Sequence, residues 1–358
     1  MKYVIDRALP ESAYMQLYRQ LKADIVSGAL RYGARLPSKR QLAGELGLSL
    51  ITVEHALALL VDEGYAAARE RSGCFVVFGG GPRPEQPRPA FAAESVSVAS
   101  APEDFPFSAL AKTMRRVLSA YDRRILARAP APGCVELRLA LAGYLARSRG
   151  LSVSPEQIIV GAGAEYLYSL IVQLLGRDRV FALEEPCYSR IRQVYEANGA
   201  SCLSLPMGED GILSSALRGC RAGALHVTPF NSYPSRVTAS ASKRHEYAQW
   251  AEDHGGVVIE DDYDAEFSSA PRQIETIFSL SPERVIYVNT FTKTLAPAMR
   301  TAYMVLGKAL LEEFRERLGF YSCTVPVYEQ LVLAEFIDSG ELERYVSRRR
   351  RRLRAVKA

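Results

Sequence analysis

The sequence lacks the features of exported, membrane-bound and zinc-binding proteins. Its 358 residues contain no run close to the about 18 consecutive apolar residues that a membrane-spanning helix needs. The first residues, MKYVIDRALPE, carry charges where a secretory signal peptide has its apolar core. The 6 cysteines are scattered, and no two of them form a C-x-x-C pair. These absences predict a cytoplasmic protein with reduced thiols and no membrane contact.

An excess of one charge sign is also missing from most of the chain. The net charge is +5, but the segment from Arg344 to Ala358 holds eight basic residues and no acid. Removing these eight charges leaves −3 for residues 1–343, so the overall charge does not argue for nucleic-acid binding. The basic segment is typical of a solvated helix end, and a contact with DNA phosphate is the alternative.

What the sequence does contain is a boundary rich in glycine and proline. Seven of the twelve residues in 79–90 are Gly or Pro, and proline restricts the backbone and removes hydrogen-bond donors. We therefore expect a semi-rigid linker over 79–104. It separates a small unit at 1–78 from a long unit at 105–358, and a chain of this length favours about two domains.

The small unit shows the pattern of three helices followed by a hairpin. Apolar residues recur at helical spacing over 14–25 and 53–60. Ser38 and Gln41 fit a capping box that opens a short helix, and Ser49 fits the N-cap of a third helix. The two β-rich segments that follow flank a charged turn. This order predicts a winged helix-turn-helix domain.

The start of the third helix is the expected DNA-reading element. In a helix-turn-helix the second helix of the pair enters the major groove, and its first residues reach the base edges. The start of the preceding helix is placed to contact phosphate, and the hairpin turn adds a phosphate or minor-groove contact. The residues expected at DNA are Lys39, Arg40, Ser49, Leu50, Thr52, His55, Arg71 and Gly73. For Thr52 and His55, a solvated surface position is an equally good interpretation.

Residues 12–78 resemble the GntR family of bacterial regulators. The matching segments are Gly33–Arg40, Leu42–Ala43, Ser49–Val53 and Gly73–Val76. The resemblance implies the DNA-binding domain of a transcriptional regulator. The family usually has arginine where this chain has Leu50, so the phosphate or base contact of that arginine is missing here.

The long unit alternates between short β-rich runs and segments of helix length. The β-rich runs are 158–160, 179–183, 224–227, 257–260, 285–289 and 303–306. This alternation predicts an α/β fold with a mainly parallel sheet that is covered by helices. Ligands bind beyond the carboxyl ends of the strands in such sheets, so the residues that follow the runs are the candidates for chemistry.

One lysine follows a β-rich run among groups that suit a phosphate. Lys293 comes after the run 285–289, and it is one of only four lysines in the long unit before the basic segment. A partly desolvated amine can attack an aldehyde cofactor; a solvated lysine is the alternative. The hydroxyl, guanidinium and backbone N–H groups that suit a phosphate dianion belong to Thr290, Thr292, Arg300, Gly163 and Ala164.

Residues that suit an aromatic cofactor ring follow other strands. Asp261 and Tyr263 are two residues apart at the end of the run 257–260, so they share a strand face. A carboxylate keeps a pyridine nitrogen protonated, and a phenol can bond a ring oxygen. A metal site is the alternative for this acidic cluster, although the histidines are dispersed. Tyr188 is placed either to stack on a ring or to pack in the core.

With these features the long unit resembles the fold-type I aminotransferases that use pyridoxal 5′-phosphate (PLP). The matching segments are Gly133–Arg138, Gly161–Glu165, Glu185–Tyr188, Glu260–Tyr263, Thr290–Lys293 and Pro297–Arg300. The resemblance implies PLP as the cofactor, with Lys293 as its Schiff-base lysine, Asp261 at the pyridine nitrogen and Tyr263 at the ring oxygen. Tyr188 would stack on the ring, and the five phosphate-binding groups named above would hold the phosphate.

The loop at 228–236 departs from the aminotransferase pattern. Ser232 and Arg236 replace the residues that the family usually has there, and Asn231 is the expected substitute for the contact with the ring edge. The helix predicted over 337–353 matches the one that leads into the family's small C-terminal domain. We expect an aminotransferase-like large domain with this small domain absent. The small domain supplies the arginine that grips a substrate carboxylate, so its absence disfavours turnover.

The whole chain resembles a MocR/GabR-type transcriptional regulator. The implied function is a DNA-binding homodimer that senses PLP itself or a small amino compound through its aminotransferase-like unit. A catalytically active aminotransferase with an accessory DNA-binding module is the alternative.

Overall fold

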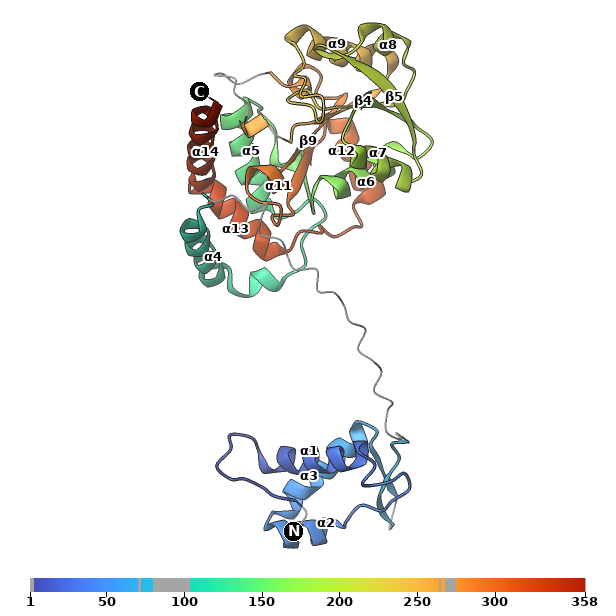
Figure 1. Cartoon of the computed structure of the whole chain (residues 1–358), viewed down its shortest axis with the longest axis vertical. Coiled ribbons are helices and arrows are strands. Elements are labelled where there is room, and N and C mark those ends of the chain that lie inside the picture. The colour runs from blue at the N-terminus through green and yellow to red at the C-terminus, as the bar shows by residue number, and fades with distance from the viewer. Residues whose placement is uncertain (1–2, 70–71, 80–103, 264, 268–274, 358) are drawn as a thin grey trace. The chain divides into compact units, whose positions relative to one another are not determined.

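The computed structural model describes residues 3–69, 72–79, 104–263, 265–267 and 275–357 (Figure 1). The chain forms two compact units, Met1–Val96 and Ser97–Ala358, called unit 1 and unit 2 below. The linker expected at 79–104 lies, apart from its two end residues, outside the described residues.

Unit 1 consists of three helices followed by an antiparallel hairpin, as the sequence predicts. The helices are α1 (Ala13–Val26), α2 (Lys39–Leu46) and α3 (Leu50–Asp62), and the strands are β1 (Ala66–Arg69) and β2 (Gly73–Val76). Their apolar faces meet in one core, in which Leu17, Leu21, Leu42, Val53 and Leu60 are fully buried. The core orients α2 and α3 as a helix-turn-helix pair with the hairpin beside it.

Polar caps decide where α2 and α3 begin. The Ser38 hydroxyl accepts the backbone N–H of Gln41 at 3.1 Å, and the Ser49 hydroxyl accepts that of Thr52 at 3.0 Å. Only half of the expected capping box forms, because the Gln41 side chain donates to Glu45 at 3.0 Å instead of accepting the backbone N–H of Ser38. The carboxylate one turn along the helix is a charged acceptor, and it therefore competes well for the Gln41 amide.

Unit 2 contains a single large sheet. Its strands are β3 (Ile158–Gly161), β4 (Val180–Glu185), β5 (Ser201–Gly208), β6 (Gly211–Ile212), β7 (Ala224–Val227), β8 (Val257–Asp261), β9 (Val285–Thr290) and β10 (Ala302–Val305). The spatial order is β3-β10-β9-β8-β7-β4-β5-β6. The five strands from β9 to β5 are parallel, whereas β10 is antiparallel to both of its neighbours and β6 is antiparallel to β5. The predicted α/β class and mainly parallel sheet are confirmed.

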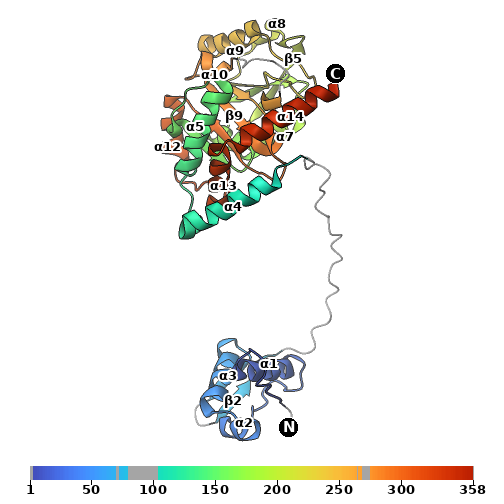
Figure 2. The same cartoon turned by 90° about the vertical axis from the view of Figure 1, so that its left-hand side faces the viewer.

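Helices cover both faces of this sheet (Figures 1 and 2). One face packs against α5 (Val135–Arg149), α9 (Ala241–His254), α13 (Val327–Asp338) and α14 (Glu341–Lys357). The other face packs against α6 (Ala164–Leu175), α7 (Ser189–Ala197) and α12 (Lys308–Leu318). The remaining helices are α4 (Phe107–Tyr121), α8 (Ser214–Gly219), α10 (Ile277–Leu280) and α11 (Phe291–Thr294). The α4 helix lies along α13, beside α14 (Figure 2). Because both faces are covered, ligands reach the sheet only at its edges.

A glycine before α5 gives a test of the packing in unit 2. Gly133 has φ +95°, and a Cβ there would lie 2.8 Å from the Val160 Cβ and 2.9 Å from Gln330 Oε1. Gly176 has a similar φ of +99°, but a Cβ there would meet nothing within 4 Å. We expect Gly133→Ala to lower the free energy of unfolding by about 1–3 kcal/mol more than Gly176→Ala, because only the former adds overpacking to the backbone strain.

Urea unfolding monitored by tryptophan fluorescence measures this difference. The single tryptophan, Trp250, is buried in α9 and therefore reports on unit 2 alone. Equal losses of stability in the two variants would contradict the packing described around Gly133.

Candidate functional site

The chemically distinctive residues of unit 2 lie where parallel strands end. Asp261 ends β8, Thr290 ends β9, and Ala164 begins α6 just after β3. We use the name strand-end cluster for the ten residues proposed from sequence as the cofactor site: Gly163, Ala164, Tyr188, Asn231, Asp261, Tyr263, Thr290, Thr292, Lys293 and Arg300. By their contacts they divide into a phosphate-facing group, a buried acid and a ring-facing group.

The phosphate-facing group combines a helix start, a guanidinium and two hydroxyls, all of which can donate hydrogen bonds. Gly163, the N-cap of α6, has φ +93°, and a Cβ there would lie 2.7 Å from Arg300 Nη2, so only glycine permits the close approach of this arginine. The Thr290 hydroxyl donates to Thr292 Oγ1 at 3.0 Å. The backbone N–H of Phe291, between them, donates to Thr301 O at 2.9 Å, which places the threonines beside the arginine segment. Such donors suit a dianion.

The carboxylate of Glu165 lies beside Arg300 in this phosphate-facing group. Arg300 Nη2 lies 3.3 Å from Glu165 Oε2, and Glu165 also pairs with Arg190 at 3.0 Å. The Arg300 side chain is 48% exposed. Its guanidinium is thus positioned by Glu165 and remains accessible to a second anion.

Asp261 is the buried acid of the cluster. Its Oδ2 accepts the hydroxyl of Tyr168 and lies 3.6 Å from His226 Nε2. Its Oδ1 is fully buried and has no hydrogen-bond partner among the described residues. A buried carboxylate oxygen without a donor is unfavourable by about 1–3 kcal/mol or more. A protonated ring nitrogen is the kind of donor that would satisfy this oxygen, so the site fits a pyridinium.

Three residues around Asp261 are absent from the sequence-based site. Tyr168 comes from α6, Tyr195 from α7 and His226 from β7. The Tyr195 hydroxyl and His226 Nδ1 are 2.6 Å apart, and all three side chains are buried. Burial, and then the charge of Asp261, raise the pKa of Tyr168 well above its usual range, so it stays a donor. No sequence signal joins these residues, since each lies on a different element.

The ring-facing group includes a hydrogen bond between two loops. The Tyr263 hydroxyl donates to the backbone oxygen of Asn231 at 3.0 Å. Lys293 Nζ lies 5.9 Å from the centre of the Tyr263 ring. The structure therefore brings together Asn231, Tyr263 and Lys293, which come from three separate segments.

Two expectations about side-chain exposure in this group need correction. Lys293 is exposed rather than desolvated, because it points outward from α11, which buries Phe291 and Thr294 instead. Tyr188 is 41% exposed and meets Tyr233 edge to face, with ring centres 6.1 Å apart. The alternative of a packed core tyrosine is therefore wrong.

The unusual Ser232 has a structural role in the loop that carries Asn231. Ser232 is buried, and its hydroxyl donates to Glu184 Oε2 at 2.7 Å. The backbone N–H of Thr228 donates to Glu184 Oε1 at 3.2 Å. Burial raises the pKa of Glu184 to about 7. The loop is thus fastened at two points to the end of β4.

A second set of carboxyl groups lies on the opposite side of the β8 end. Glu260 accepts the backbone N–H groups of Ile277 at 3.0 Å and Phe278 at 2.8 Å, at the start of α10. Asp262 accepts the Tyr287 hydroxyl at 2.6 Å. Burial, and then the charge of Asp262, raise the pKa of Glu260 to about 8. The alternation that places Asp261 and Tyr263 on one face of the strand thus places Glu260 and Asp262 on the other.

In unit 1 the start of α3 presents side chains outward. Leu50 is 50% and Ile51 is 67% exposed, and His55 is also exposed while its ring meets Tyr14 edge to face. Thr52 is half-buried, and its hydroxyl is 2.8 Å from that of Ser49. Leu50 and His55 are therefore available to a ligand, whereas Ser49 and Thr52 take part in capping α3.

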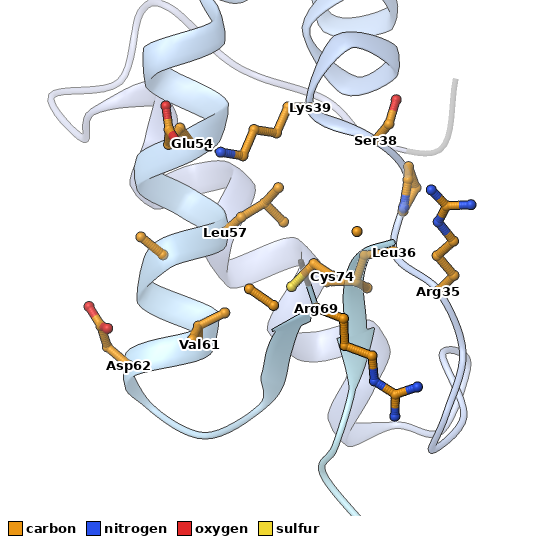
Figure 3. Close-up of a pocket in the computed structure, with 14 residues that line it drawn as sticks. Arg35, Leu36, Ser38, Lys39, Glu54, Leu57, Val61, Asp62, Arg69 and Cys74 are labelled. Carbon is orange, nitrogen blue, oxygen red and sulfur yellow. Dashed lines mark hydrogen bonds and ion pairs between the residues drawn. The ribbon is translucent and has the colours of Figure 1, made fainter. Parts of the chain in front are cut away.

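A groove of about 550 Å³ lies between the start of α2, the outer face of α3 and the hairpin (Figure 3). Lys39 pairs across it with Glu54, and Lys39 lowers the pKa of Glu54. Arg35 lies against Gly73, where a Cβ would be 3.0 Å from the arginine Nε, and Arg69 also lines the groove.

The groove adds Arg35 to the cations considered from sequence. Arg35 and Arg69 line it together with Lys39, and Arg40 is exposed at the start of α2. Arg69 belongs to the charged hairpin turn for which the sequence predicts a phosphate or minor-groove contact, whereas Arg35 lies between the predicted elements and was missed. The expected contact from Arg71 falls outside the described residues.

Among the residues that the structure describes, no helix is both long enough and apolar enough to cross a membrane. In the same residues, no three or more His, Cys, Asp and Glu side chains are grouped as metal ligands.

Comparisons with known proteins identify relatives of unit 1 and of the whole chain. The model of the bacterial regulatory proteins of the gntR family matches residues 13–76. The HTH-type transcriptional regulator YdeL of Bacillus subtilis is 33% identical over 99% of this chain and 79% of its own length. The rhizopine catabolism regulatory protein MocR of Rhizobium meliloti is 28% identical over 97% and 76%. The pyridoxine biosynthesis regulator PdxR of Corynebacterium glutamicum is 29% identical over 96% and 76%.

A solved aminotransferase resembles unit 2. The α-aminoadipate aminotransferase LysN of Thermus thermophilus, solved with N-(5′-phosphopyridoxyl)-L-leucine, is 26% identical with a TM-score of 0.63. The similarity covers 70% of this chain and 65% of LysN. The chain thus spans just under two thirds of that enzyme.

The buried Glu260 gives a test of the electrostatics around β8 that needs no ligand. An acid whose pKa is higher in the folded than in the unfolded chain binds a proton on folding. The free energy of unfolding of unit 2 should therefore fall as the pH rises from about 5 to about 8. Glu260→Gln should flatten this slope by up to about 1.4 kcal/mol per pH unit, because the variant has no proton to lose.

Urea unfolding at several pH values, followed by Trp250 fluorescence, measures the slope. The matched control is Glu316→Gln, which removes an exposed carboxylate of α12. A slope that is the same in Glu260→Gln as in the wild type would contradict the proposed protonation of Glu260.

Proposed function

Because the chain belongs to the MocR-type family of helix-turn-helix transcriptional regulators, which join a GntR-type DNA-binding unit to an aminotransferase-like unit, we propose that its DNA binding responds to PLP held by the strand-end cluster. The observation that carries the proposal is the buried, unpartnered Oδ1 of Asp261. A carboxylate oxygen in this position requires a donor, and the protonated nitrogen of PLP is one.

Unit 1 binds DNA, as in the other regulators of the family. We propose that the exposed Leu50 and His55 at the start of α3 meet base edges, and that Lys39, Arg40 and the Gly73 turn meet phosphates. Ser49 and Thr52 act indirectly, because their hydroxyls hold the start of α3.

The ten residues of the strand-end cluster would divide the cofactor among them. The Asp261 carboxylate would accept from the ring nitrogen, Tyr263 and Asn231 would lie at the ring oxygen, and the half-exposed ring of Tyr188 would stack. The phosphate would meet the donors at the start of α6, the two threonine hydroxyls and Arg300. When bound, PLP supplies an electron-withdrawing ring and an aldehyde that reacts with amines. Lys293 would provide the protein's own amine.

The effector is PLP itself or a small amino compound. The relatives support both classes by name, since PdxR is a regulator of pyridoxine biosynthesis and MocR of rhizopine catabolism. Either ligand would act by favouring one arrangement of the regulator over another.

We also propose that the protein acts as a homodimer. A two-fold dimer matches two half-sites on DNA. Unit 2 leaves large apolar side chains exposed, including Leu126 at 83% and Phe320 at 72%, as surfaces that bind other proteins do. Sedimentation that detects only monomer at micromolar concentration would contradict this.

A catalytic aminotransferase is the second candidate function. The similarity of unit 2 to LysN favours it, because the aminotransferase-like sheet and strand-end cluster are both present. The release of a keto acid from an amino acid, lost in Lys293→Ala, would support this function over a regulatory one.

The cofactor proposal predicts a spectroscopic change that depends on one lysine. Titration of the protein with PLP should produce the visible absorbance band of a lysine-bound aldehyde cofactor. Lys293→Ala should abolish the band, and Lys308→Ala, which removes an exposed lysine of α12, should retain it. Asp261→Ala should weaken PLP binding by on the order of ten-fold or more, because the ring nitrogen loses its acceptor. An unchanged band in Lys293→Ala would contradict the role of this lysine.

The DNA proposal separates phosphate contacts from base contacts. Arg40→Ala should weaken binding to the protein's own upstream region and to unrelated DNA alike, and reduce the salt slope by about 1. His55→Ala should reduce the preference for the upstream region by about 1–3 kcal/mol.

Fluorescence anisotropy at several salt concentrations measures both effects. Arg19→Ala removes an exposed arginine on α1, outside the helix-turn-helix pair and the hairpin, and serves as the control. An Arg40→Ala variant with the salt slope of the wild type would argue against a phosphate contact.

A further inference from the structure

We propose that Arg149 is a positioning residue for the PLP site, holding the two segments that present Asn231 and Tyr263 in the arrangement that receives the ring. This inference rests on the proposed function, since it assumes that the strand-end cluster binds PLP. Arg149 itself lies outside that cluster and is not expected to touch the cofactor.

Arg149 is a buried guanidinium at the end of a helix. It is the last residue of α5, and Gly150, with φ +68°, ends the helix immediately after it. Its side chain is only 9% exposed. A buried cation is strongly unfavourable unless it is paired. The groups that pair with Arg149 therefore reveal which parts of the fold it holds.

Those groups lie directly next to the ring-facing residues. Arg149 Nη2 is 2.5 Å from Asp262 Oδ2, and Asp262 lies between Asp261 and Tyr263 in sequence. The guanidinium carbon is 4.8 Å from the centre of the Phe230 ring, a cation–π contact, and Phe230 precedes Asn231.

The segment that carries Asn231 and the segment that carries Tyr263 are thus connected at two points, by the Tyr263 hydroxyl and by Arg149. The hydroxyl of Tyr263 joins them by donating to Asn231 O at 3.0 Å. The side chain of Asp262 points away from that of Asp261, as alternation along a strand requires, and meets Arg149 there. Loss of Arg149 would remove one of these two connections and would leave the buried carboxylate of Asp262 without its cation.

Through Asp262, Arg149 is also connected to β9, the strand that leads to Lys293. Asp262 also accepts the Tyr287 hydroxyl at 2.6 Å, and its backbone N–H donates to Val288 O at 2.9 Å. Both partners belong to β9, which ends at Thr290, three residues before Lys293. Burial lowers the pKa of Arg149, but Asp262, Tyr287 and Glu260 outweigh it and raise the pKa, so the charge persists.

A second buried arginine on the same helix provides a matched control. Arg138 has a side chain 8% exposed and donates to Gly133 O at 3.2 Å and Pro155 O at 2.8 Å. These partners lie before α5 and before β3, and none of them neighbours a residue of the strand-end cluster. Arg138 therefore reports the general cost of removing a buried arginine from α5.

The test compares PLP binding by full-length variants, measured as the visible absorbance band during titration with PLP. Arg149→Met should raise the PLP concentration for half-saturation by on the order of ten-fold or more. Arg138→Met should change it by less than about two-fold even if unfolding in urea becomes as easy as in Arg149→Met. Arg149→Lys should recover part of the affinity, since it keeps the charge but lacks the planar group that stacks on Phe230.

A milder variant guards against loss of folding. Phe230→Leu keeps the buried ion pair of Arg149 with Asp262 and removes the aromatic face that Arg149 and, at 5.7 Å, Arg244 contact. It should therefore fold and still weaken PLP binding. Phe230→Leu and Arg149→Lys should also shift the pH at which the visible band changes, because that pH depends on the groups around the ring, whereas Arg138→Lys should not.

The outcomes separate this inference from the proposed function. A wild-type chain that gives no band with PLP would overturn both. A wild-type band together with the same half-saturation in Arg149→Met, Phe230→Leu and the wild type would overturn only the positioning role. Equal weakening by the Arg138 and Arg149 variants would overturn it as well, because the effect would then be one of stability.

Discussion

Asp261 is buried at the carboxyl end of β8 with one oxygen bonded to Tyr168 and the other without a protein donor. This incomplete satisfaction of a buried carboxylate explains much of unit 2. The parallel strands place the acid at a sheet edge where loops meet. Tyr168 and His226 lie against its Oδ2, and Tyr195 in turn contacts His226. A protonated ring nitrogen would supply the missing donor to Oδ1, which is the reason for proposing PLP at this place.

The end of β8 separates two kinds of chemistry by simple alternation. Asp261 points toward the accessible cluster, whereas Glu260 and Asp262 point toward a buried layer that contains Arg149. That layer contributes no group to the proposed PLP site. Its Asp262 is nevertheless the neighbour in sequence of Asp261 and Tyr263, which do belong to the proposed site. A strand end that is charged on both sides is costly to bury. Charged groups on both sides of the β8 end fit a site in which the positions of the side chains, and not only the stability of the fold, matter for function.

Unit 1 obeys a different constraint, since its function requires exposed rather than buried groups. The apolar core fixes α2 and α3, and the caps at Ser38 and Ser49 fix where these helices start. Leu50 and His55 are then left exposed together with several cations. The chain thus combines exposed side chains at the start of α3 and around the groove of unit 1 with a proposed ligand site around the buried Asp261 of unit 2.

The sequence by itself determined the order of the elements, since the apolar periodicity of α3 and the β-rich runs from Ile158 to Leu306 depend only on local residues. It also determined that the residues after β8 and β9 lie at one edge of the sheet, because parallel strands bring them there whatever the details of packing. Only the tertiary structure decided that Tyr168 and His226 contact Asp261, that Arg149 pairs with Asp262, and that Lys293 is exposed. These facts depend on side chains from separate elements meeting in space, and neither periodicity nor motif spacing records such contacts.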